Sequence, residues 1–269
     1  MSLEIHDEDV TRRYSKRIVT HTDVSIIIPA LNEEATIKAV VDRCLALPLE
    51  TQVIVVNDGS EDKTLEILQG YGDKITLLTN PKPSGKGHAI VQALPHAQGI
   101  ATIVQDADLE YSPEQIPSLV QPILDNKANV VYGTRFANGY SKDMALPNKI
   151  VNIMLAWSVR ILFLRKITDE ATCYKAFRTS LLQSFDLQCT RFEFCPEVTA
   201  KALRCNQTIQ EVPIDYVPRS KEAGKKIRWY DAPEAFWTLF KYRFWNPMAQ
   251  PKAIASQSEP ETPQVSVPD

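Results

Sequence analysis

The sequence predicts an α/β fold, in which a mostly parallel, doubly wound sheet is flanked by helices. Three observations lead to this prediction. Short runs of β-branched residues alternate along the chain with segments of helical periodicity. Polar residues follow each apolar run, as they do where parallel strands end. The chain has 269 residues and is 44% apolar, which suffices for one large or two modest domains with a sizeable core.

The elements follow one another in a regular order. A first strand, 24–29, leads into a helix whose expected N-cap is Asn32 and which ends before Pro48. Further strands are expected at 52–57, at 75–79, from Ala101 onward, at 129–133 and at 209–216. The remaining helices are expected at about 61–69, 87–97, 114–125, 146–165, 192–204 and 231–245.

The organisation along the chain follows from composition. Residues 1–21 form a charged lead-in, and residues 22–230 form the main domain. Residues 231–245 form an amphipathic helix rich in aromatic residues. Residues 246–269 are rich in Pro, Ser and Gln and are expected to be disordered.

Composition also excludes several classes of function. A net charge of −3 argues against a general nucleic-acid-binding protein. The first 19 residues lack the apolar core of a signal peptide, and no run of about 20 apolar residues suggests a membrane span. The five cysteines show no C-x-x-C spacing, which is typical of reduced cytosolic thiols.

Two aspartates follow the fourth strand at a spacing that suits a metal. Asp106 and Asp108 come directly after an apolar run, where open α/β sheets bind their ligands. Residues i and i+2 of an extended chain point the same way, so both carboxylates can share one divalent cation. Few, hard oxygen ligands favour Mg²⁺ or Mn²⁺ held partly by a substrate's phosphates. The alternative is an ordinary surface turn, in which this pattern is also common.

A glycine-rich stretch lies on the same expected edge. Gly85, Lys86 and Gly87 suggest a phosphate site at the start of a helix. The stretch is not a Walker loop, and the chain has no G-x-G-x-x-G fingerprint. Each polar loop residue taken alone can be a solvated side chain or a helix cap. Because the fold brings their loops together, they jointly favour a nucleotide site built around carboxylates and a metal.

Five segments in this order resemble the family-two glycosyltransferases, which have the Rossmann-like GT-A fold. They are VSIIIPALNEE (24–34), VVNDGS (55–60), SGKGHA (84–89), QDADLE (105–110) and YGTRF (132–136). The resemblance covers roughly residues 22–230. Within the family, the chain is similar to the dolichyl- or polyprenyl-phosphate hexose synthases. This similarity implies a nucleotide-sugar donor, a polyprenyl phosphate acceptor and a Mg²⁺ or Mn²⁺ cofactor.

The resemblance also implies roles for individual residues. The metal on the donor diphosphate would be bound by Asp106 and Asp108, and Arg135 would stabilise the phosphate that arrives or departs. The donor would be contacted by Pro29, Leu31, Glu33, Asp58, Ala107 and Glu110, with Lys86 at the phosphates. Glu110 departs from the pattern, because the mannosyl members usually have an amide there. The identity of the sugar therefore stays open.

Cations in the second half of the chain are the candidates for acceptor binding. In the family, Arg219, Lys225 and Lys226 form a phosphate clamp, although a run of charges is more often a solvated face. Lys175 and Lys149 are further candidates, the latter on a helix that either packs in the core or lies in a membrane surface. Asp169 is the candidate general base. A phosphate acceptor is already ionised near pH 7, so Asp169 can instead orient cations.

These inferences together predict an inverting enzyme that transfers a hexose from GDP-mannose or UDP-glucose to a polyprenyl phosphate. It would work in the cytoplasm, peripherally attached to the inner face of a membrane through cations and aromatic residues. One alternative is a glycosyltransferase of the same fold that uses a soluble or protein-bound hydroxyl acceptor and needs Asp169 as its base. Another is a catalytically idle nucleotide-sugar sensor.

Overall fold

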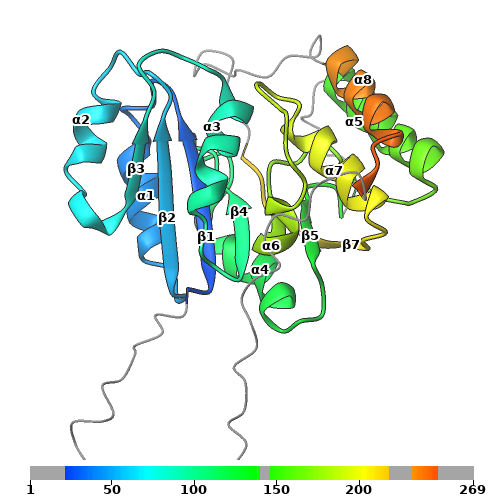
Figure 1. Ribbon diagram of the computed structural model, residues 1–269, viewed down its shortest axis with the longest axis horizontal. Helices are drawn as coiled ribbons and strands as arrows, with labels where there is room; N and C mark the ends of the chain where they lie inside the picture. The colour runs from blue at the N-terminus through cyan, green and yellow to red at the C-terminus, as the bar shows by residue number, and fades with distance from the viewer. Residues whose placement is uncertain (1–21, 138, 140–145, 218–231, 248–269) are drawn as a thin grey trace, which may run out of the picture.

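The computed structural model describes residues 22–137, 139, 146–217 and 232–247. Seven strands in this part of the chain form one sheet, in the order β3-β2-β1-β4-β6-β5-β7 (Figure 1). Strand β6 runs antiparallel to both of its neighbours, β4 and β5, and every other pairing is parallel. The predicted α/β fold with a mostly parallel sheet is confirmed.

The strands are short, and their sequences explain their places in the sheet. The central strand β1 is an almost continuous apolar run because helices cover both of its faces. Strand β7 lies at one edge and carries polar residues. The bounds are β1 Val24–Ala30, β2 Thr51–Asn57, β3 Thr76–Thr79, β4 Ala101–Val104, β5 Val130–Thr134, β6 Lys175–Arg178 and β7 Ile209–Pro213.

With one exception, the helices lie close to their predicted positions. They are α1 Ile37–Leu45, α2 Thr64–Gln69, α3 Lys86–Ala93, α4 Ile116–Leu124, α5 Leu146–Phe163, α6 Thr179–Gln183, α7 Phe194–Arg204 and α8 Ala232–Arg243. The exception is the short α6, which is not among the helices expected from the sequence. The predicted N-cap is wrong, because α1 begins five residues after Asn32. Asn32 takes the left-handed conformation with φ 51°, and its Oδ1 accepts a hydrogen bond from the Glu61 N–H at 2.9 Å. It thus joins the loops after β1 and β2.

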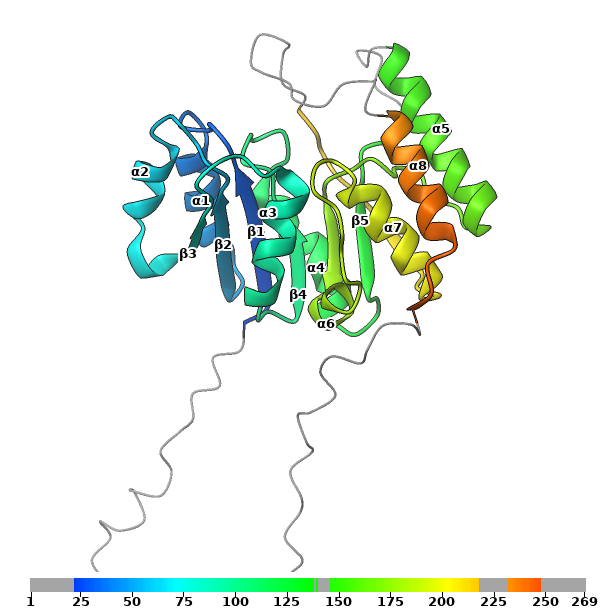
Figure 2. The ribbon, with the colours of Figure 1, turned by 45° about the horizontal axis from the view of Figure 1, so that its top comes forward.

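Two apolar layers sandwich the sheet. One buried cluster joins alternate residues of β1 to helices α1 and α4, and a second joins the opposite face to α3, α6 and α7. A third cluster lies beyond the β5 side of the sheet, between α5, α7 and α8. Helices α5 and α8 lie side by side there in both ribbon views (Figure 2). Within the described residues, no helix is both long and apolar enough to cross a bilayer.

Candidate functional site

The site lies along the C-terminal ends of the parallel strands, and we call this side of the sheet the site edge. Strands β1, β2, β4 and β5 all point toward this edge, so the loops that follow them are neighbours. Strand β6 runs in the opposite direction, so its first residue lies at the edge where the other strands finish. The segment before β6 therefore reaches the same place as the predicted donor loops.

Asp58, which directly follows β2, holds the neighbouring loop after β3 in place. Its buried carboxylate accepts hydrogen bonds from Asn80 Nδ2 at 2.8 Å, from the Ser84 N–H at 2.9 Å and from the Gly85 N–H at 2.8 Å. Three donors from one loop fix that loop against β2. The carboxylate thereby shapes the site, and direct contact with the base or ribose stays a prediction.

The first turn of α3 differs from the predicted phosphate cradle. Gly85 precedes the helix with φ 103°, a conformation that favours glycine. Its N–H donates to the carboxylate of Asp58, and the N–H of Gly87 donates to the Arg191 carbonyl oxygen at 2.8 Å. These two backbone donors are engaged within the protein, which argues against a phosphate cradle built from them. The ammonium of Lys86 is the group that remains suited to a phosphate.

Lys86 links three parts of the site. Its ammonium forms an ion pair with Asp106 Oδ1 and also donates to Cys173 Sγ at 3.2 Å. Burial lowers the pKa of Lys86, but Asp106 and the nearby Cys173 and Cys195 together outweigh it, and the net pKa lies well above its usual value. The lysine therefore stays charged. A diphosphate at the predicted donor site would compete with the Asp106 carboxylate for the lysine.

The buried side-chain amide of Gln105 stabilises the loop that carries Asp106 and Asp108. Gln105 Nε2 donates to the Asp106 carbonyl oxygen at 2.9 Å and to the Tyr111 carbonyl oxygen at 3.2 Å, which closes the loop. Asp108 Oδ1 accepts the Glu110 N–H at 3.1 Å. Both predicted metal ligands thus lie in one compact turn directly after β4.

Arg135 and Asp169 form the most extensive ionic contact of the site. The guanidinium donates through Nε to Oδ2 and through Nη2 to Oδ1, both at 2.7 Å, and the Arg135 N–H donates to Oδ2 at 3.0 Å. Asp169 is fully buried. Burial lowers the pKa of Arg135, but Tyr111 and Asp169 outweigh it, so the pKa is well above its usual value. Both carboxylate oxygens of Asp169 are bound to this cation.

Aromatic and amide groups complete the surroundings of Arg135. The guanidinium carbon lies 5.1 Å from the ring centre of Tyr216 and 5.2 Å from that of Phe136. The Tyr216 hydroxyl donates to Glu110 Oε2 at 2.8 Å, which ties the donor loop to this cation. Asn152 of α5 approaches from the other side, with its Oδ1 3.4 Å from Nη2.

Lys175 is not where an acceptor contact requires it. The residue is fully buried, its ammonium donates to the Glu170 carbonyl oxygen, and it lies 3.9 Å from the ring centre of Tyr132. This burial argues against the predicted acceptor contact, and we assign Lys175 to the support of the sheet edge instead. Lys149 is half-buried near the start of α5. The predicted clamp of Arg219, Lys225 and Lys226 lies outside the described residues.

Further predicted donor residues lie at the ends of β1 and β4. Pro29 belongs to β1, Leu31 follows it, and both are partly exposed at the edge. Glu33 is buried, and one of its oxygens accepts the Thr36 hydroxyl at 3.1 Å. Ala107 is buried between the two aspartates. These positions agree with a donor pocket, and the contacts themselves stay predictions.

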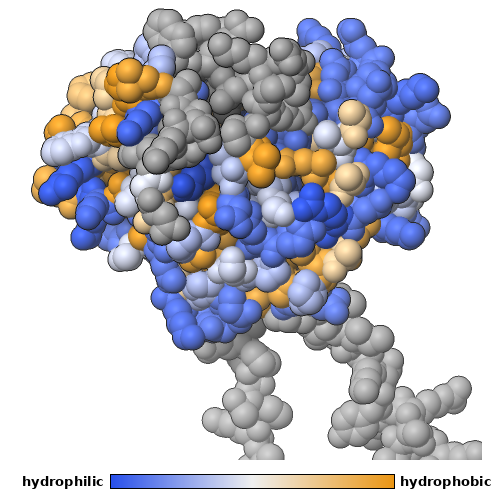
Figure 3. All heavy atoms as spheres, turned by 180° about the vertical axis from the view of Figure 1, so that it is seen from behind, coloured by the Kyte–Doolittle hydropathy of each residue, from blue (hydrophilic) through white to orange (hydrophobic). Residues whose placement is uncertain are grey.

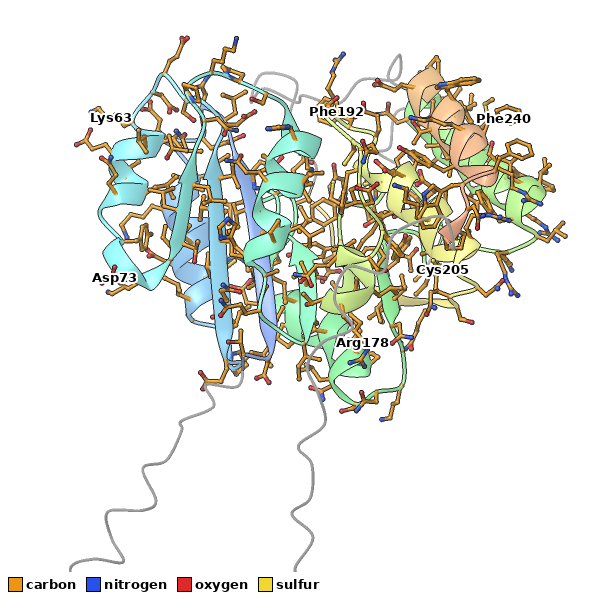
Figure 4. The ribbon with its side chains drawn as sticks, viewed as in Figure 1. Lys63, Asp73, Arg178, Phe192, Cys205 and Phe240 are labelled. Carbon is orange, nitrogen blue, oxygen red and sulfur yellow. The ribbon has the colours of Figure 1, made fainter. Side chains whose placement is uncertain are left out.

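An exposed apolar surface lies beside the site on α5 and α8. Trp157 is 56% exposed and Trp237 is 62% exposed. The other large apolar residues exposed on these helices, or directly after α8, are Leu146, Ile150, Ile153, Met154, Ile161, Phe240 and Phe244. Figure 3 shows apolar patches among charged groups at this end of the molecule, and Figure 4 shows the ring of Phe240 pointing outward from α8. We call this set the α5–α8 surface.

Sequence reasoning missed several residues that build the site. Gln105, Cys173 and Tyr216 contact the predicted residues directly, and Glu211 of β7 accepts hydrogen bonds from the segment before β6. A polar Gln at the end of an apolar run was a signal for the first. The sequence contains no comparable signal for Cys173, Tyr216 and Glu211, because the residues they contact are far away in the chain.

The turn from Asp106 to Asp108, which we call the D-x-D turn, offers oxygen ligands that fit a hard divalent cation. Its candidate ligands are carboxylate oxygens, which suit Mg²⁺ and Mn²⁺. Among the described residues, no group of three or more His, Cys, Asp and Glu side chains is arranged to hold a metal ion. The two aspartates would therefore share the ion with substrate oxygens or water, as is usual for Mg²⁺ on phosphates.

Comparison with known proteins gives consistent matches. A family model described as glycosyl transferase family 2 matches residues 25–185. A UDP-N-acetylglucosamine–dolichyl-phosphate N-acetylglucosaminyltransferase from Methanococcus voltae is 30% identical over 76% of this chain and 90% of its own. A dolichol-phosphate mannosyltransferase from Pyrococcus furiosus is 26% identical over 75% of this chain and 58% of its own. This chain spans 49% to 61% of the length of three of the curated relatives.

The solved structures support the same fold. Glucosyl-3-phosphoglycerate synthase from Mycobacterium tuberculosis, crystallised with Mn²⁺, uridine diphosphate and glucosyl-3-phosphoglycerate, superposes with a TM-score of 0.61. The two are 21% identical, and the superposition covers 82% of this chain and 80% of the other. At this identity the likeness concerns the fold.

Proposed function

The chain belongs to glycosyl transferase family 2, and from this premise we propose that it transfers a hexose from a nucleotide-diphosphate sugar to a polyprenyl phosphate. The observation that carries the choice of acceptor is the position of α5. Its buried Asn152 contacts Arg135, while its opposite face exposes Trp157 and other large apolar residues. A lipid whose phosphate reacts beside Arg135 meets an apolar surface on the same helix.

Asp169 supports a phosphate acceptor over a hydroxyl acceptor. A hydroxyl must lose its proton, which calls for a base with a free oxygen near the acceptor. Both oxygens of Asp169 accept hydrogen bonds from Arg135, and the carboxylate is fully buried. A lipid phosphate is already ionised near pH 7 and needs no base. We therefore assign Asp169 the orientation of Arg135.

In the proposed reaction, a phosphate oxygen of the acceptor attacks the anomeric carbon of the donor sugar in one inverting step. The bond from that carbon to the nucleotide diphosphate breaks at the same time. Asp106 and Asp108 would hold a Mg²⁺ or Mn²⁺ ion, which supplies Lewis-acid stabilisation of the departing diphosphate. Lys86 binds the diphosphate, and Arg135 stabilises the charge shared between donor and acceptor.

The α5–α8 surface supports peripheral attachment to the cytosolic face of a membrane. Cations lie beside its rings: the Arg160 guanidinium lies 5.4 Å from the ring centre of Trp157, and that of Arg243 lies 6.0 Å from the ring centre of the partly buried Phe163 next to this surface. Aromatic rings beside cations suit the headgroup region of an anionic bilayer. Such attachment would bring the site to the acceptor.

The sugar and the base of the donor remain to be chosen by experiment. The named relatives use different sugars, and Glu110 replaces the amide that is usual in mannosyl members of the family. We propose mannose or glucose, from GDP-mannose or UDP-glucose. UDP-N-acetylglucosamine, the donor named for the relative from Methanococcus voltae, belongs in the same screen.

The test is a donor screen with Mn²⁺ or Mg²⁺, with and without a polyprenyl phosphate. Transfer only in the presence of the lipid phosphate is expected. The double substitution Lys225→Ala and Lys226→Ala should lower kcat/KM for the lipid at least tenfold, because charged bonds to phosphate contribute about 1.5–3 kcal/mol each. Donor affinity should hardly change. Transfer to a hydroxyl acceptor alone would favour the soluble-acceptor enzyme, and donor binding without any transfer would favour a sensor.

A further inference from the structure

Glu211 makes an unusual set of contacts from the edge strand β7. A single oxygen, Oε1, accepts the Thr168 N–H at 2.8 Å, the Thr168 hydroxyl at 2.8 Å and the Asp169 N–H at 3.2 Å. All three donors belong to two consecutive residues. The Glu211 side chain thereby fixes the backbone at Thr168 and Asp169, and so the position from which the Asp169 side chain extends.

The same two residues are fixed to the strand that carries Arg135. The Thr168 hydroxyl lies 2.7 Å from the hydroxyl of Thr134, the last residue of β5. Asp169 binds the Arg135 guanidinium through both of its oxygens. Contacts therefore run without a break from Glu211 through the 168–169 segment to the guanidinium.

We propose that Glu211 is a positioning residue, which holds Asp169 so that Asp169 orients Arg135 toward the reacting phosphate. The inference rests on the proposed function for what Arg135 does, but the contacts themselves do not depend on it. Without Glu211, two backbone N–H groups lose their acceptor, and the carboxylate that fixes the guanidinium can shift. A displacement of about 1 Å in a reacting group can cost a hundredfold in rate.

The place of Glu211 in the fold separates this role from a general effect on stability. Strand β7 pairs with β5 through the backbone over five residue pairs, and this ladder does not involve the side chain. The contacts also predict which substitution is tolerated. Because one oxygen accepts all three hydrogen bonds, the carbonyl oxygen of a glutamine can replace it, whereas alanine cannot.

The first test is kinetic and uses the full chain. Glu211→Ala should lower kcat about tenfold or more with donor KM nearly unchanged, because misplacement affects the reacting groups and not donor binding. Glu211→Gln should restore most of the activity. Gln210→Ala, on the exposed neighbour in β7, is the matched control and should behave as the wild type. If Glu211 acts through Arg135, Glu211→Ala should add less than about a twofold loss to Arg135→Ala.

Full additivity of those two losses, or normal transfer by Glu211→Ala, would overturn the proposal. The second test does not need any catalytic activity. Hydrogen exchange at the N–H groups of Thr168, Asp169 and Arg135 should quicken at least about tenfold in Glu211→Ala and stay slow in Glu211→Gln. Unchanged exchange in the alanine variant would overturn the inference. A wild type that uses no polyprenyl phosphate would refute the proposed function alone, and the exchange result would still decide the role of Glu211.

Discussion

Lys86 and Asp106 form an ion pair across the edge of the sheet, so that a lysine from α3 neutralises the first of the two predicted metal ligands. The ammonium and a divalent cation compete for the same carboxylate. Under the proposed function, a bound diphosphate would attract the lysine, and the carboxylate would then become available to the metal.

Lys86→Met should make Mn²⁺ bind more tightly to the nucleotide-free protein and make the donor bind more weakly. Each effect should be at least about tenfold, because hydrogen bonds to charged groups contribute about 1.5–3 kcal/mol. The concentration of free Mn²⁺ would be measured by electron paramagnetic resonance. Lys82→Met, on an exposed lysine of the loop before α3, is the control and should change neither affinity. Unchanged or weaker Mn²⁺ binding in the Lys86 variant would contradict the competition.

Asp108→Ala should abolish transfer and leave the fold intact. The carboxylate lies in a partly exposed turn and adds little to the core, whereas loss of the metal removes several kcal/mol of charge stabilisation. Initial rates and urea unfolding would be measured on one preparation. Asp125→Ala, on an exposed aspartate after α4, is the control. Turnover like that of the wild type, with metal still required, would refute the assignment.

Asp169→Asn should destabilise the protein and slow transfer without changing the shape of the pH–rate profile. It leaves the buried Arg135 without its counter-charge, which typically costs about 3–5 kcal/mol. Glu197→Gln is the matched control, because Glu197 and Lys201 form a buried ion pair 2.6 Å apart in α7. It should lose similar stability yet transfer normally per folded molecule. Loss of one ionisation from the profile in Asp169→Asn would instead identify a general base.

Membrane attachment should be reversible and sensitive to salt. Each Lys or Arg near an anionic surface contributes about 1 kcal/mol, and salt screens that attraction. Co-sedimentation with vesicles that contain anionic lipid should fall at high salt, and should fall at least about tenfold in Trp157→Ser with Trp237→Ser, since both rings are lost. Neutral vesicles provide the comparison. A membrane-bound fraction that resists both high salt and carbonate would contradict this prediction.

The sheet could be predicted because its signals are local. Runs such as 24–29 and 52–57 are β-branched and apolar, and polar loops follow them, so their positions and the edge they share follow from short stretches of sequence. The position of the D-x-D turn follows from the same logic. Helix bounds were less accurate, since α1 begins at Ile37 although Asn32 suggests an earlier start.

The contacts within the site could not be predicted, because they join residues far apart in the chain. From the sequence, Lys175 is expected to be an accessible cation. In the structure its strand, β6, lies between β4 and β5, and the side chain is buried. From the sequence, the N–H groups of Gly87 and His88 at the start of α3 are expected to be available, but the fold brings the carbonyl oxygens of Arg191 and Thr190 to accept their hydrogen bonds. Glu211 is one acidic residue in an ordinary strand, and its partners lie over 40 positions earlier.

The single reversed strand has a consequence for protein engineering. Strand β6 joins the half of the sheet that carries the D-x-D turn to the half that carries Arg135. On the β4 side, the seam consists of three backbone pairings and the contact of Thr102 with Thr179, together with the stacking of Tyr111 on Tyr174. A hybrid that exchanges residues 22–124 for those of a relative must match this seam and also the loop contacts across it, such as Lys86 with Cys173 and the Gly87 N–H with the Arg191 carbonyl oxygen. Under the proposed function, such hybrids would test whether the two halves choose the sugar and the acceptor separately.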